Sequence, residues 1–108
     1  MTTIKEWILE TQEPEDIISI SKNGCVNGAC NDLIYYNDTV KFYYDHKDEI
    51  WELLEQESKE FGHNTVFSFM STWSEYANVT SDTTFKNLLA WWSVEHVCNQ
   101  IIWNEEVA

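Results

Sequence analysis

The stretch from Asp38 to Phe61 limits what this chain can fold into more than any other part of the sequence. It contains no Gly or Pro, it starts at an Asp suited to cap a helix, and Gly62 follows it as a typical helix end. Its apolar residues recur at helical spacing and form a narrow stripe: Tyr43, Ile50, Leu54 and Phe61, with Val40 and Trp51 at the margin. The pattern predicts one long helix over about 38–61, with a kink near Asp45 and His46.

The N-terminal third predicts two shorter helices. Thr3 and Glu6 have the spacing of a capping box, so a first helix is expected over Ile4–Thr11. Pro14 suits the first position of a second helix that stops by Asn23, although the apolar run in residues 15–23 also fits a strand. Residues 24–30 are expected to form a turn, and residues 33–36 a helical turn.

The C-terminal part predicts a short helix over about 66–73 and a last helix over about 82–104, capped by Asp82. The last helix is apolar nearly all round, which is typical of a buried helix. One face carries Phe85, Leu88, Leu89, Trp92 and Trp103, and the other carries Trp91, Val94, Ile101 and Ile102. We therefore expect an all-α fold, a compact bundle of about five helices, in a single domain spanning residues 1–108.

Charge restricts the function. Nineteen Asp and Glu residues stand against six Lys and no Arg, which gives a formal net charge of −13 over 108 residues. Such a chain is not expected to bind nucleic acid, because phosphate recognition depends on basic side chains. The composition is 44% hydrophobic and 15% aromatic, so the acidity is expected to belong to a folded domain and not to a disordered tail.

Much of this acidity falls on one side of the long helix. Opposite the apolar stripe lie Asp45, Asp48, Glu49, Glu52 and Glu60, with Glu55 at the edge. Several of them, such as Asp45 and Asp48 or Asp48 and Glu52, are three or four residues apart, a spacing at which like charges weaken a helix by a few tenths of a kcal/mol. Two interpretations stay open: a solvated helix face, or a row of carboxylates that resembles nucleic-acid phosphates and fits a basic groove of a partner protein.

Paired aromatic residues suggest a second recognition feature. Adjacent helical side chains point about 100° apart, so both members of a pair are rarely buried in a small domain. Tyr36, Tyr44 or Trp91 beside acidic residues would suit a recognition surface or a homodimer seam. The alternative is that these rings pack at the margins of the core.

Catalytic and metal sites find little support in the sequence. The possible zinc ligands are Cys25, Cys30, His46, His63, His96 and Cys98, and their spacing matches no standard zinc motif. No spacing selects a nucleophile with its base, and no glycine-rich phosphate loop is present. We expect no metal, no cofactor and no enzymatic activity. The sequence also shows neither a signal peptide nor a membrane span, so a soluble cytoplasmic protein is expected.

Several motifs resemble a family of short, acidic, uncharacterised proteins of bacteriophages and mobile elements. The matching residues are Gly24-Cys25-x-x-Gly28, Leu33-Ile34-Tyr35-Tyr36-x-Asp38-Thr39-x-x-Phe42-Tyr43, Glu49-Ile50-x-x-Leu53-Leu54, and Phe85-Lys86-Asn87 followed by Trp91 and Glu95. Some similar reading frames carry loose antirestriction labels. The resemblance implies a phage or plasmid product in a bacterial cytoplasm, with no known catalytic residues. This chain has Asn23 where the family often has His before Gly-Cys.

The leading hypothesis is an accessory protein that mimics nucleic acid and inhibits a basic nucleic-acid-handling protein, of the anti-restriction or anti-CRISPR type. Its expected partner-binding residues are Asp45, Asp48, Glu49, Glu52, Glu55, Glu60, Tyr36 and Tyr44. The alternative hypothesis is a non-catalytic structural or assembly module that acts as a homodimer or binds a phage protein.

Overall fold

The computed structural model describes residues 3–23, 39–76 and 85–104, and these residues form helices without any strand. The helices are α1 (Ile4–Thr11), α2 (Pro14–Asn23), α4 (Thr39–Glu60), α5 (Val66–Tyr76) and α6 (Phe85–Trp103). The predicted all-α fold with about five helices is confirmed, and residues 15–23 are helical. The predicted turns within residues 24–36 and the caps Asp38 and Asp82 lie outside the described residues.

Local sequence signals fix the ends of the first two helices. The Thr3 side chain accepts a hydrogen bond from the backbone N–H of Glu6 at 3.1 Å, so Thr3 caps α1 as predicted. Pro14 is the first residue of α2, a position where its missing N–H and fixed φ cost nothing. Glu15 and Asp16 occupy the first turn of α2, where the positive end of the helix dipole stabilises carboxylates.

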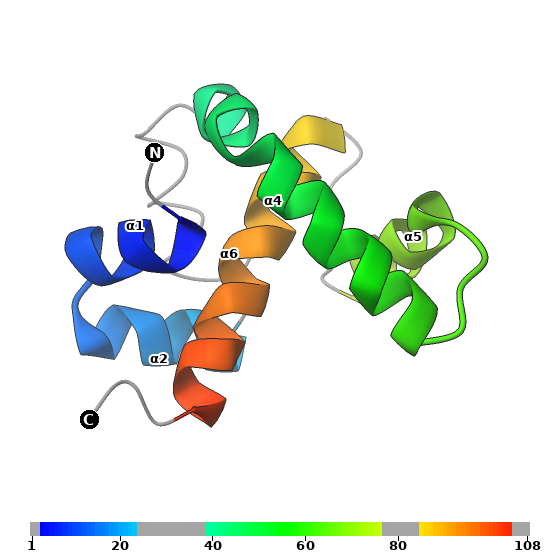
Figure 1. Ribbon diagram of the computed structural model, residues 1–108. Coiled ribbons are helices and arrows are strands. Elements are labelled where there is room, and N and C mark those ends of the chain that lie inside the picture. The colour runs from blue at the N-terminus through cyan, green and yellow to red at the C-terminus, as the bar shows by residue number, and fades with distance from the viewer. Residues whose placement is uncertain (1–2, 24–38, 77–84, 105–108) are drawn as a thin grey trace.

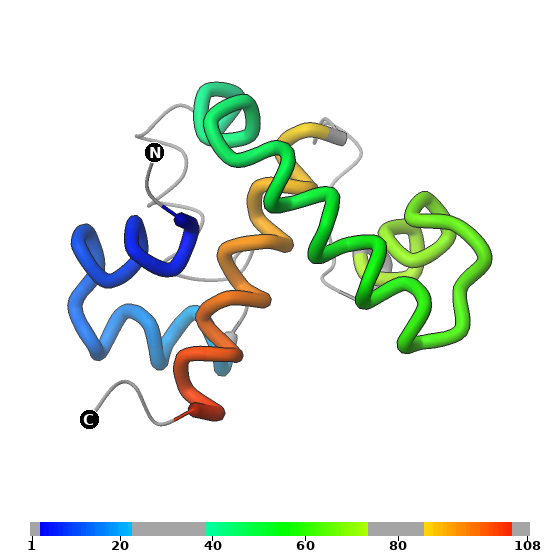
Figure 2. Tube along the Cα trace, viewed as in Figure 1, coloured from blue at the N-terminus to red at the C-terminus, as the bar shows by residue number. Residues whose placement is uncertain are grey.

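The long helix α4 ends as the sequence predicts and bends in its N-terminal part. Gly62 has a φ of +77°, the left-handed conformation that glycine adopts without strain, and the N–H of His63 donates to the carbonyl of Ser58 at 2.8 Å. In Figures 1 and 2 the first turns of α4, in teal, are seen nearly end-on, whereas the green remainder runs across the view. A bend is therefore present in the part of α4 where the kink is predicted.

Helix α6 is the central element of the core, as its all-round apolar character predicts. It contacts each of the other four described helices, with α1 and α2 on one side and α4 crossing it, while α5 lies on the far side (Figure 1). Nine consecutive or near-consecutive α6 positions are buried: Leu89, Ala90, Trp91, Trp92, Ser93, Val94, Val97, Cys98 and Ile101. The Ser21 hydroxyl, which lies 2.6 Å from the Asn99 side-chain oxygen, adds a polar contact between α2 and α6.

The buried stripe of α4 is rotated and shortened relative to the prediction. Its buried residues are Phe42, Tyr43, His46, Ile50, Leu54 and Ser58. Phe61, placed in the stripe by projection, is 68% exposed, and Val40 is 42% exposed. The N–H of Phe61 still donates to the carbonyl of Glu57 at 3.0 Å, so the helical register reaches this residue, but its ring lies at the end of the helix, where it stacks on Phe69 of α5 and stays largely open to water. Trp103, at the last residue of α6, is likewise 74% exposed.

None of the helices within the described residues has the length and apolar character needed to cross a membrane.

Candidate partner-binding surface

The outward face of α4 carries a row of exposed carboxylates, Asp45, Asp48, Glu52 and Glu55, which we call the acidic ridge. The row exists because Phe42, His46, Ile50 and Leu54 turn the opposite face of the helix into the core. Ridge neighbours are three or four residues apart, so their side chains project from one side of the helix. Among the described residues, Asp48, Glu52 and Glu55 take part in no ion pair.

A lysine partly neutralises the N-terminal end of the ridge. The Lys41 ammonium lies 2.7 Å from a carboxylate oxygen of Asp45, and both side chains are exposed. The hydrogen bond from Lys41 lowers the pKa of the Asp45 carboxyl. An exposed pair of this kind contributes little to stability, but it removes one free negative charge from the surface. Within the described parts of the chain, the unpaired members of the ridge are therefore Asp48, Glu52 and Glu55.

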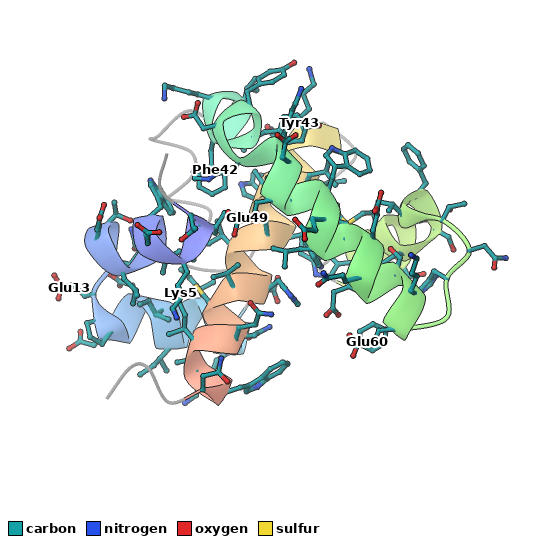
Figure 3. The ribbon with its side chains drawn as sticks, viewed as in Figure 1. Lys5, Glu13, Phe42, Tyr43, Glu49 and Glu60 are labelled. Carbon is teal, nitrogen blue, oxygen red and sulfur yellow. The ribbon has the colours of Figure 1, made fainter. Side chains whose placement is uncertain are left out.

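Glu49, one of the predicted partner-binding residues, lies beside the ridge and is engaged by α1. Its carboxylate accepts a hydrogen bond from the backbone N–H of Ile4 at 3.0 Å, at the first turn of α1. Figure 3 shows Phe42 and Glu49 on the side of α4 that faces α1. The Phe42 ring meets Trp7 of α1 edge-on, with 4.8 Å between ring centroids. Glu49 is half-buried and joins two helices, so its first role is structural.

The last turn of α4 forms a second acidic group with a different environment. Glu60 is exposed at the end of the helix (Figure 3), whereas the Glu57 carboxylate is mostly buried and lies 3.8 Å from Nε2 of His96. Burial raises the pKa of Glu57, and the neighbouring Glu60 carboxylate raises it further. The His96 ring stacks on Trp92, with centroids 4.8 Å apart, and burial lowers its pKa.

The aromatic pairs divide between surface and core. Tyr43 is buried while Tyr44 is 53% exposed, which confirms the predicted exposure of Tyr44. Lys86 of α6 donates a hydrogen bond to the Tyr44 hydroxyl and lies 4.8 Å from its ring centre, and this hydrogen bond lowers the pKa of the phenol. The suggested surface role of Trp91 is wrong, because Trp91 is 8% exposed in the central helix. Tyr36 lies outside the described residues.

His46 and Cys98 are both buried. His46 is buried against Phe42, with ring centroids 4.6 Å apart, and this burial lowers its pKa. Cys98 is fully buried, which raises the pKa of its thiol to about 12. Within residues 3–23, 39–76 and 85–104, no three side chains of His, Cys, Asp or Glu come together as metal ligands do. Cys25 and Cys30 lie outside these ranges.

His63 and Ser68 form a pair with the separation of a nucleophile and its base. Nδ1 of His63 lies 3.0 Å from the Ser68 hydroxyl oxygen, at the start of α5. Such a pair becomes reactive when a third group orients the base. Of the described histidines, it is His96 that has a carboxylate within ion-pair distance, that of Glu57. The His63–Ser68 contact stabilises the turn between α4 and α5.

A further set of exposed acids was not predicted from the sequence as a binding surface. It lies on α1 and on the turn to α2, and comprises Glu6, Glu10, Glu13 and Glu15. Figure 3 shows Glu13 at that turn, on the opposite side of the molecule from Glu60. The signal was present in the sequence as a high local density of Glu, but helical spacing within one element could not show it, because these residues come from two helices and their connection.

Comparison with known proteins identifies a family but no characterised relative. The model of a family described as a domain of unknown function, DUF7222, matches residues 1–107, so this chain belongs to that family. No curated protein and no solved structure gives a significant match.

Proposed function

We propose that this DUF7222 member is a non-enzymatic accessory protein whose acidic ridge occupies a basic groove of a nucleic-acid-handling protein and inhibits it. The observation that carries the proposal is the row of Asp48, Glu52 and Glu55, which is exposed on the outward face of α4 and forms no ion pair with the part of the chain that the structure describes. An ionised carboxylate that is left unpaired on a rigid helix is available to the Lys and Arg residues of a partner.

The spacing of the ridge fits one strand of nucleic acid. At about 1.5 Å per residue, Asp45 to Glu55 spans about 15 Å. One strand of duplex DNA places a phosphate about every 3.4 Å along the axis, so about four phosphates occupy that length. The four carboxylates of the ridge, of which Asp45 is paired with Lys41, approach this density, whereas a whole duplex carries twice as many charges. The proposed mimicry is therefore of one backbone strand and not of both.

The charge of the whole chain supports encounter with such a partner. A net charge of −13 on 108 residues produces a negative potential that attracts basic surfaces and repels nucleic acid and acidic proteins. The exposed glutamates of α1 and the α1–α2 turn extend this field beyond α4. Complementary potential of this kind raises association rates, and its effect falls with salt.

The proposal also includes a setting. The sequence motifs resemble those of phage and mobile-element proteins, so we place the protein in a bacterial cytoplasm, with restriction and CRISPR effectors as natural targets.

A second candidate, an assembly module, is favoured by one observation: Trp103 exposes 74% of its surface at the end of the central helix.

The test compares two triple variants that change the net charge equally. The ridge variant replaces Asp48, Glu52 and Glu55 with their amides. The control variant replaces Glu10, Glu13 and Glu15 with Gln, so its charge also changes by three, but in the α1–α2 region. Purified restriction and CRISPR effectors are assayed for DNA binding with increasing amounts of each protein, at several salt concentrations.

We expect the wild-type chain to compete with DNA for at least one effector, with an inhibition constant that rises with salt. The ridge variant should lose most of this inhibition and show a weaker salt dependence, while the control variant keeps most of it. Equal losses in the two variants would mean that total charge, and not the ridge, is responsible. Sedimentation at two protein concentrations tests the homodimer form of the assembly module, which requires a tight dimer.

A further inference from the structure

The turn between α4 and α5 is fixed by its own hydrogen bonds. Gly62 takes a left-handed conformation, and the N–H of His63 donates to the carbonyl of Ser58 at 2.8 Å. On the α5 side, the Thr65 hydroxyl accepts a hydrogen bond from the N–H of Ser68 at 3.0 Å and caps the helix. A C-terminal glycine motif followed closely by a capped helix leaves little freedom to the side chains at this corner.

Phe61 is the exposed end of an aromatic row that starts in the core. Its ring stacks on Phe69, with centroids 6.1 Å apart and planes 27° apart, and Phe69 meets the buried Trp92 edge-on at 5.9 Å. Phe61 nevertheless exposes 68% of its surface. A large aromatic side chain held in place on one side and open to water on the other is the usual form of an interface anchor, because little side-chain entropy is lost on binding.

The charges beside Phe61 indicate that its partner carries positive charge. Glu57 and Glu60 lie in the last turn of α4, at the negative end of the helix dipole, where carboxylates are unfavourable. The one basic residue of that turn is Lys59. The corner therefore combines an exposed aromatic ring with carboxylates that gain from an added cation. A second copy of this chain would bring its own net charge of −13, so self-association at the corner is opposed by repulsion.

The geometry points to Phe61 as the apolar anchor of the interface, docking against a basic amphipathic helix of the partner whose Lys or Arg residues meet the exposed Glu60. This inference rests on the proposed function, because it assigns an anchor to the same acidic helix. The ridge supplies long-range attraction, whereas the anchor selects partners that carry apolar side chains between their basic ones. The ridge alone does not make this distinction.

Two synthetic peptides of about 18 residues, or five helical turns, test the anchor. One carries Leu every three or four residues and Lys at the positions between, so that a helix has a basic and an apolar face, and in the other every Leu is replaced with Gln at equal charge. Binding of each labelled peptide is measured by fluorescence anisotropy at about 0.15 M salt, where surface charges are partly screened. The variants are Phe61→Ser and Val40→Ser. Val40 is an exposed apolar residue at the other end of the same helix, about 30 Å away.

The wild-type chain should prefer the Lys/Leu peptide, and Phe61→Ser should weaken that binding about tenfold, or about 1.4 kcal/mol, without changing the Lys/Gln peptide. Val40→Ser should change neither, and circular dichroism should show both variants folded. A wild-type preference that survives Phe61→Ser overturns the anchor and leaves the ridge proposal standing. Absence of binding to both peptides even at low salt overturns both proposals. A dimer that Phe61→Ser dissociates would assign the corner to self-association and also overturn the anchor.

Discussion

Replacing Glu49 with Ala removes the carboxylate that joins α4 to the start of α1, whereas replacing Glu52 with Ala removes a carboxylate of the ridge. The two substitutions are chemically identical, lie three residues apart in the same helix, and change helix propensity and net charge equally. They differ in environment: Glu49 is half-buried and accepts the Ile4 N–H at 3.0 Å, and Glu52 is exposed. The difference between them isolates the contribution of this contact to stability.

The magnitude follows from the contact. A hydrogen bond to a charged group contributes about 1.5–3 kcal/mol, and loss of a helix cap typically costs about 1 kcal/mol. Because Glu49 is only half-buried, we expect a loss near the lower limit, about 1–2 kcal/mol. For a domain of this size, 1 kcal/mol corresponds to a shift of roughly 4–8 °C in Tm. Glu52→Ala should stay within about 0.5 kcal/mol of the wild type.

The measurement is urea and thermal unfolding of both variants, followed by far-ultraviolet circular dichroism at neutral pH. Glu49→Ala should unfold at clearly lower urea concentration and temperature than Glu52→Ala, with the same dependence on urea. Equal unfolding curves for the two variants would refute the assigned role of Glu49. The comparison also matters for function, because a loss of inhibition in a Glu49 variant would reflect weakened folding as well as altered charge.

Three further predictions concern ionisation. Burial lowers the pKa of His46 and His96, so below the ordinary His pKa of about 6.5 the unfolded chain binds more protons than the folded chain. The free energy of unfolding should therefore fall as the pH drops below that value. Urea titrations at several pH values measure this dependence, and His96→Gln should reduce it. Burial raises the pKa of Glu57, so its ionised carboxylate at neutral pH lowers the stability of the folded chain, and protonation removes this cost. Glu57→Gln should raise Tm at pH 7, and a lower Tm would show that the charged form is instead stabilised by its surroundings. The Cys98 thiol, buried and with a pKa of about 12, should not react with a thiol reagent at pH 8 until the chain unfolds. A variant with the other two cysteines changed to Ser measures this directly, and rapid reaction of the native protein would contradict the burial.

The helix boundaries were predictable because their causes are local. Thr3 caps α1 by reaching a backbone N–H three residues away, Pro14 starts α2 through its own fixed φ, and Gly62 ends α4 through its positive φ. The central position of α6 was also predictable, since a helix apolar on every side is stable only when other elements surround it. These features require no knowledge of how distant segments meet.

The candidate site was predictable only in part. Helical periodicity places Asp45, Asp48 and Glu52 on one side of α4, and all are exposed. The same periodicity places Glu49 with them, but periodicity cannot show that α1 packs against that edge of the helix. Projection also places Phe61 in the core stripe, because it cannot show that the core does not extend to the end of the helix.

The sequence by itself determined the helical elements, the ends of α1, the start of α2 and the end of α4, the buried central helix and the strongly acidic composition, because each depends on the pattern of neighbouring residues. Only the tertiary structure decided which of the acids on α4 are free. Contact with α1 assigns Glu49 to a helix cap, and contact with α6 places Glu57 beside His96. The physical reason is that the environment of a carboxylate depends on the groups that packing brings near it, and those groups come from distant parts of the chain.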